Sequence, residues 1–210
     1  ANIQAGDSVA IVNSFFNGNQ AYTYSCKGKT YLGYGLQIVT AADISVSNVT
    51  ANGNYLFGAH LEGTNVNVSV GSFSNNGTGN PADHVGKGLE IVSTGSDSFI
   101  SLFEVNASNN QLFGANIQAE GEVFIESSVF SGNISYKSTC KGKTYDGYGL
   151  KVVTVGDIEL LDVTASNNGL YGAHLEGANV NIETGFFNEN GSGSPTNPTG
   201  KGLEVVSTGT

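Results

Sequence analysis

The chain has 210 residues, with 30 Gly, 3 Pro and a net charge of −10. Hydrophobic residues make up 39% and charged residues 12%, which excludes a disordered chain, because disorder requires low hydrophobicity and high charge. All 8 basic residues are Lys, so we expect no nucleic-acid partner, since phosphate recognition relies on clusters of Lys and Arg. No run approaches the about 20 apolar residues that span a bilayer, so we expect no membrane insertion.

The sequence repeats itself at a distance of 114 positions. The motif CKGKTY begins at Cys26 and again at Cys140. Residues 1–96 align with residues 115–210 without a gap, and about 55 of these 96 positions are identical. The pattern predicts one domain that contains a tandem repeat, with a first unit at 1–114 and a second at 115–210.

Each unit contains shorter segments that open with Gly followed by Leu or Ala. The predicted coil starts are Gly35, Gly58, Gly88, Gly114, Gly149, Gly172 and Gly202. Two short alternating runs follow each Gly, as at Ala59/Leu61 and Val66/Val68, and then a third apolar position such as Phe73. This alternation predicts short strands with one buried face.

Strands this short cannot bury their apolar faces alone. Equivalent strands stacked about 4.8 Å apart bury them continuously, as in a solenoid with four coils per 114-residue unit. Asn-Gly or Asn-Asn ends most second runs, as at Asn76-Gly77 and Asn109-Asn110. Asn tolerates the left-handed backbone of a corner, and we expect its side chain to bond the coils above and below.

Segments such as 58–63 followed by Asn75-Asn76-Gly77 resemble the repeat signature of right-handed parallel β-helix proteins of the pectate-lyase-like group. The resemblance covers nearly the whole chain. It implies an all-β, right-handed, single-stranded parallel β-helix of about 8–9 coils with three short strands each. We expect a tandem-repeat member of cell-surface or adhesin type.

In enzymes of this group, the resemblance implies a site on the outer face of the first strand, with Asp clusters, Ca²⁺ and a Lys or Arg base. The corresponding outward positions are Gln37, His60, Glu90, Asn116, Lys151, His174 and Glu204. This row contains no Asp, and the sequence contains no Arg. We therefore expect no catalytic residues, no metal and no cofactor.

A polar cluster of one His and two Glu on adjacent coils is expected twice. Its members are His60, Glu62 and Glu90, and then His174, Glu176 and Glu204. Such a group could act in acid–base chemistry or bind a metal. The alternative is a solvated sheet face, on which opposite charges of neighbouring coils give mild stabilisation.

Two long insertions, 17–34 and 131–148, are the predicted ligand-binding loops. Their candidate residues are Lys29, Tyr31, Tyr34, Lys143, Tyr145 and Tyr148. Tyr combined with Lys and Gly suits contact with sugars or with a protein partner. Alternatively, the Tyr rings pack the loops onto the sheet below.

Each insertion carries one cysteine, Cys26 or Cys140. Four coils separate them by about 19 Å, whereas a disulfide requires Cα atoms within about 7 Å. We expect the two cysteines not to pair with each other. Each is a free thiol, half of an intermolecular bridge, or separated from a partner outside this sequence.

The chain starts and stops inside a coil without a polar cap, so we expect an excerpt of a longer protein. The predicted function is a structural or adhesive repeat segment of an extracellular or cell-surface protein, which binds carbohydrate or neighbouring copies of itself. The alternative is a polysaccharide-active lyase or glycoside hydrolase, or a carbohydrate binder like a phage tailspike.

Overall fold

The computed structural model describes residues 1–20, 22–24, 29–31, 33–77, 86–134, 136–137, 144–145, 147–191 and 200–209. For 22–24, 29–31, 136–137 and 144–145 it describes the backbone alone.

Most of the chain belongs to two sheets that face each other across the core. The first sheet contains, in spatial order, β1 (Asn2–Ala5), β5 (Leu36–Thr40), β7 (Phe57–Gly63), β9 (Lys87–Ser93), β11 (Phe113–Ala119), β15 (Tyr148–Thr154), β18 (Tyr171–Gly177) and β21 (Lys201–Ser207). The second contains β2 (Val9–Phe15), β6 (Ile44–Thr50), β8 (Val66–Ser72), β10 (Phe99–Asn106), β12 (Glu122–Glu126), β16 (Ile158–Leu161) and β19 (Val180–Ile182).

Three short pairs complete the set. They are the parallel pair β17 (Val163–Thr164) and β20 (Gly185–Phe186), and the antiparallel pairs β3 (Tyr22–Tyr24) with β4 (Lys29–Tyr31) and β13 (Tyr136–Lys137) with β14 (Thr144–Tyr145).

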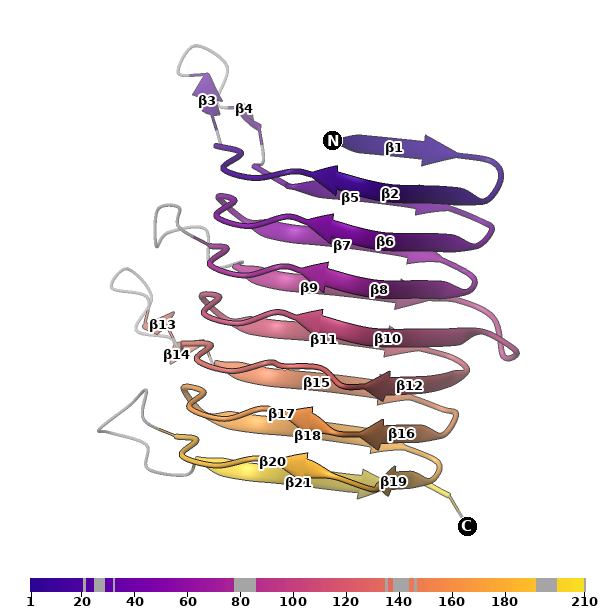
Figure 1. Ribbon diagram of the computed structural model, residues 1–210, viewed down its shortest axis with the longest axis vertical. Helices are drawn as coiled ribbons and strands as arrows, with labels where there is room; N and C mark the ends of the chain where they lie inside the picture. The colour runs from indigo at the N-terminus through magenta and orange to yellow at the C-terminus, as the bar shows by residue number, and fades with distance from the viewer. Residues whose placement is uncertain are drawn as a thin grey trace.

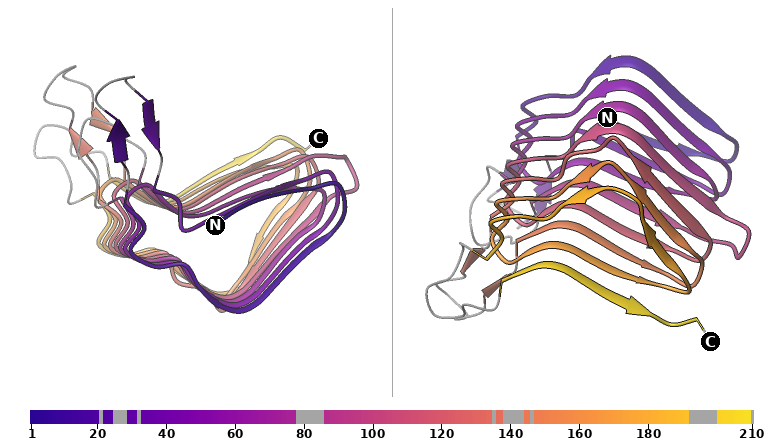
Figure 2. Two further views of the ribbon diagram at one scale, coloured as in Figure 1. Left: turned by 90° about the horizontal axis from the view of Figure 1, so that it is seen from above. Right: turned by 60° about the horizontal axis from the view of Figure 1, so that its bottom comes forward.

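Within both sheets every neighbouring pair is parallel, and the coils stack in chain order (Figure 1). Seen along the axis, successive coils superpose, and the chain passes alternately from the first sheet to the second (Figure 2). The right-handed parallel β-helix predicted from the sequence is confirmed. The described segments contain no helix, and hence none that could cross a membrane.

The second and third apolar runs of a coil differ from the prediction of separate strands. In β2, β6, β8 and β10 one strand continues past the second run and bends at a residue with positive φ, namely Asn13, Asn48, Val70 and Glu104. Ser127 and Asp162 adopt the same conformation directly after β12 and β16, where the strand ends; φ lies between 49° and 54° at all six. The bend turns the strand toward the corner, so two sheets enclose the three-sided cross-section.

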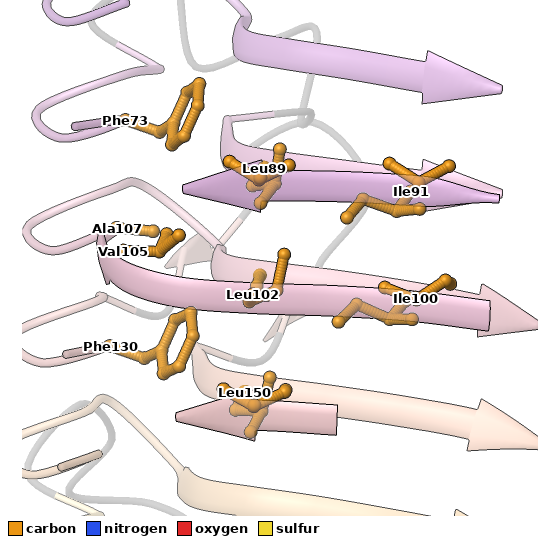
Figure 3. Close-up of a cluster of buried hydrophobic side chains, with 14 of the residues drawn as sticks. Phe73, Leu89, Ile91, Ile100, Leu102, Val105, Ala107, Phe130 and Leu150 are labelled. Carbon is orange, nitrogen blue, oxygen red and sulfur yellow. The ribbon is translucent and has the colours of Figure 1, made fainter. Parts of the chain in front are cut away.

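The inward side chains form one continuous core along the axis (Figure 3). Leu89 and Ile91 of the first sheet face Ile100 and Leu102 of the second, and all four have 0% exposure. Phe73, at the third apolar position, also has 0% exposure. The alternation in the sequence therefore corresponds to burial, as expected for strands with one inward face.

A ladder of asparagines lines the corner between the second and first sheets. Its members are Asn19, Asn54, Asn76, Asn110, Asn133, Asn168 and Asn190. Each side-chain oxygen, from Asn54 onward, accepts from the backbone N–H and the Nδ2 of the preceding member, as in Asn76 N to Asn110 Oδ1 at 2.9 Å. Buried amides thereby satisfy one another from coil to coil.

Candidate functional site

The outward face of the first sheet carries one row of polar side chains, because its strands pair in register. Consecutive members of the row are directly opposite each other. The row runs Asn2, Gln37, His60, Glu90, Asn116, Lys151, His174 and Glu204. Parallel pairing thus makes neighbours of residues that lie 23 to 35 positions apart in the sequence.

His60, Glu90 and Lys87 form a hydrogen-bonded cluster within this row. His60 Nδ1 lies 2.9 Å from Glu90 Oε2, and Lys87 Nζ contacts Glu90 Oε1. Glu62 is more distant, with its Oε2 3.8 Å from His60 Nε2. The side chains of His60, Lys87 and Glu90 are only 14–18% exposed. The structure therefore brings the three predicted residues together and adds Lys87.

The cluster keeps Glu90 ionised. Burial by itself would raise the pKa of this carboxyl, but the hydrogen bonds from His60 and Lys87, together with their charges, lower it from 4.5 to about 2. Because Nδ1 of His60 contacts Glu90, its Nε2 lies on the side of Glu62.

The second copy reproduces this geometry at a more exposed place. His174 Nδ1 lies 2.8 Å from Glu204 Oε2, and Lys201 contacts the other oxygen of Glu204. The hydrogen bond from Lys201, followed by that from His174, lowers the pKa of Glu204. Glu176 Oε2 lies 4.0 Å from His174 Nε2.

Sequence reasoning missed the two lysines, although a signal was present. Both units read Lys-Gly-Leu-Glu, at Lys87–Glu90 and at Lys201–Glu204. In a regular strand, residues three positions apart point to opposite faces. The burial pattern of β9 breaks its alternation at Gly88, and this break places Lys87 on the same outward side as Glu90.

A second outward row, beside the polar one, is a stack of aromatic rings and lysines. Its members are Tyr34, Phe57, Lys87, Phe113, Tyr148, Tyr171 and Lys201. Ring centroids lie 4.8–5.2 Å apart, and the ring planes are within 7° of parallel. Lys87 Nζ lies 5.5 Å from both the Phe57 and the Phe113 centroids. Neighbouring coils therefore cover the ring faces, and such contacts stabilise the stacking of coils.

The predicted loop residues divide into two groups. Tyr34 and Tyr148 belong to the aromatic stack, and Tyr148 is the first residue of β15. Lys143 lies outside the described residues, as do the side chains of Lys29, Tyr31 and Tyr145. Cys26 and Cys140 lie outside them too.

Lys151 differs from the other lysines of this face. It stands between Asn116 and His174 in the polar row, and its Nζ lies 5.9 Å from the Tyr148 ring. Among the described side chains no carboxylate forms an ion pair with it. The equivalent position of the first unit is Gln37.

Groups of three or more His, Cys, Asp or Glu arranged to hold a metal ion are absent from the described part of the chain. The first sheet presents a strip of hydrogen-bonding groups together with one lysine, Lys151, that forms no ion pair with a described side chain. Such a strip can hold an extended polar ligand along the helix axis.

The chain is 29% identical over 140 residues to a protein named "Probable pectin lyase E" from Aspergillus niger. The architecture is pectate-lyase-like. The match covers 67% of this chain and 34% of the relative, so the chain spans about a third of that protein's length. No protein-family profile and no solved structure matches the chain.

Proposed function

We propose that this chain is a segment of an extracellular repeat protein that binds a polysaccharide along the outward face of its first sheet. The observation that carries the proposal is the polar row from Asn2 to Glu204, in which amide, imidazole, carboxylate and amine groups repeat at the coil spacing of about 4.8 Å. A polysaccharide also presents hydroxyls at regular intervals, so one polymer meets hydrogen-bonding partners on successive coils. The pectin-related relative supports this ligand class.

Lys151 is the group on this face that favours an acidic polymer, because each of the four outward carboxylates already has a His or Lys within 4.0 Å. Every lysine side chain that the structure describes belongs to the first sheet, namely Lys87, Lys151 and Lys201. Glu90 and Glu204 neutralise two of them, which leaves Lys151 to meet a carboxylate of the ligand. An adhesive contact with an acidic cell-wall or matrix polysaccharide fits this arrangement.

Cleavage of the same polymer is the second candidate, favoured by the name of the relative. His60 and His174 are the residues that would serve as general bases, because each is oriented by a carboxylate at Nδ1. Release of unsaturated products from pectin, abolished by His60→Gln together with His174→Gln, would establish this reaction.

The binding proposal is tested by affinity electrophoresis and calorimetry with polygalacturonate. Lys151→Gln, which installs the residue of the first unit, is expected to weaken binding about threefold, because a surface charge pair contributes up to about 1 kcal/mol. The reciprocal variant, Gln37→Lys, is expected to strengthen it. Added salt should reduce both differences.

Lys151→Arg is the matched control, since it keeps the charge and should keep the affinity. The proposal fails if polygalacturonate does not bind the chain. It also fails if Lys151→Gln and Gln37→Lys leave the affinity unchanged.

A further inference from the structure

A groove of about 460 Å³ lies on the outward face of the second sheet, away from the polar row. Its lining residues come from the N-terminal halves of β2, β6, β8 and β10 and from the residues just before them. Figure 1 shows these four strands as neighbours in the second sheet. Parallel pairing aligns Ala10, Ser45, Asn67 and Ser101 along its length. These side chains are small or amidic, so they leave room above the strands.

Phe99 forms one wall of the groove. This residue is 42% exposed and makes no ring contact with any described residue, in contrast to the stacked rings of the first sheet. Two hydrogen bonds hold the backbone at Phe99. Phe99 N donates to Asn65 Oδ1 at 2.9 Å, and Asn65 Nδ2 donates to Asp43 Oδ1 at 2.9 Å. The backbone that carries this exposed side chain is therefore held in place before any ligand arrives.

The repeat provides a comparison within the same molecule. A smaller groove of about 320 Å³ adjoins the first, and Phe99 lines both. The rest of its polar and aromatic lining comes from the second unit, namely Glu122, Phe124, Asp157 and Glu159. These residues occupy the places of Ser8, Ala10, Asp43 and Ser45, at the repeat distance of 114. The phenyl ring of Phe124 thus occupies space in the second unit that the methyl group of Ala10 leaves open in the first. The two units keep the same strands but offer different surfaces.

We propose that the groove of the first unit binds a neutral saccharide. A sugar ring has an apolar C–H face that packs on the free side of Phe99, and hydroxyls that bond to Ser45, Asn67 and Ser101. The ligand is neutral because Asp43 lines the groove and no described strand of the second sheet contains a lysine. This site is independent of the acidic-polymer binding proposed for the first sheet.

Titrations of the isotope-labelled chain with cellohexaose, xylohexaose and mannohexaose, each followed by amide NMR, test the proposal. At least one oligosaccharide is expected to shift the amides of Ser45, Asn67 and Phe99. Ala10→Phe should lower its affinity at least tenfold, as should Ser45→Glu. Both variants copy the residues of the second unit, Phe124 and Glu159, so the β-helix already accommodates them at equivalent strand positions.

Glu159→Ser alters the other groove two strands away from Ser101 and should leave the affinity unchanged. Lys151→Gln should likewise leave neutral-sugar binding unchanged while it weakens the binding of polygalacturonate. Each of the two proposals can therefore be refuted without the other. The saccharide site is overturned if none of the three oligosaccharides binds. It is also overturned if Ala10→Phe binds as well as the unaltered chain.

Discussion

Gly88 lies directly against the side chain of Asn110. A Cβ built on Gly88 would stand 2.5 Å from Asn110 Nδ2 and 2.6 Å from the carbonyl oxygen of Gly114. The same contact with the asparagine ladder recurs at the other coil-opening glycines that precede a complete coil, such as Gly58 against Asn76 Nδ2 at 2.7 Å. The glycine that opens a coil is therefore required by the close approach of the ladder, because φ at these positions is not in the left-handed region.

Gly88→Ala is expected to lower the free energy of unfolding by about 3 kcal/mol, because the added methyl group overlaps backbone as well as side-chain atoms. Urea denaturation followed by circular dichroism measures the loss. Gly6→Ala is the control, since no atom lies within 4 Å of its Cβ position. Equal stability of the two variants would contradict this account.

Asn110→Ala is expected to cost about 3 kcal/mol. It removes the oxygen that accepts from Asn76 N and Asn76 Nδ2, at 2.9 and 3.1 Å, and leaves two buried donors without a partner. The exposed Asn181 of the second sheet serves as the control, and its replacement by Ala should change the stability by less than about 0.5 kcal/mol. Hydrogen exchange at the Asn76 amide gives a local readout, which should accelerate in Asn110→Ala alone.

The pH dependence of stability should report the Glu90 cluster. The pKa of Glu90 is about 2 in the folded chain, below the ordinary value of 4.5, so its stabilisation is present above pH 4.5 and is lost as the pH falls toward 2. Between these limits we expect a loss of about 2–3 kcal/mol, measured as the difference in unfolding free energy between the unaltered chain and Glu90→Gln. Lys87→Met removes one hydrogen bond to Glu90 and should move the transition to higher pH. A difference that stays constant over this range would refute the assignment.

Phe113→Ala should interrupt the aromatic stack. Phe113 lies 5.2 Å from the Tyr148 centroid and 5.5 Å from Lys87 Nζ, and the loss of both contacts is expected to cost about 2 kcal/mol. Near-ultraviolet circular dichroism should weaken in parallel, because stacked tyrosines contribute to it. Phe15, 77% exposed, is the matched control whose replacement by Ala should have little effect.

Part of the candidate site could be predicted from the sequence. Alternation placed His60 and Glu90 on one outward face, and strand pairing makes them direct neighbours. The corner asparagines were predicted to bond between coils, but their register was missed. The sequence does not decide whether Asn109 or Asn110 lies opposite Asn76, and the ladder joins Asn76 to Asn110. The period-two alternation of the strands does not continue through a corner, so the sequence does not show which corner residues of adjacent coils lie opposite each other.

The sequence by itself determined the parallel β-helix, the buried positions and the coil-opening glycines, because the 114-residue repeat and the period-two pattern follow directly from how a strand buries one face. Only the tertiary structure decided which side chains meet between coils. The ion pair of Lys87 with Glu90, the stacked rings and the open groove beside Phe99 depend on bends in the strands and on lateral stacking. The sequence pattern does not show these features, because they depend on which residues of different coils become neighbours in the folded chain.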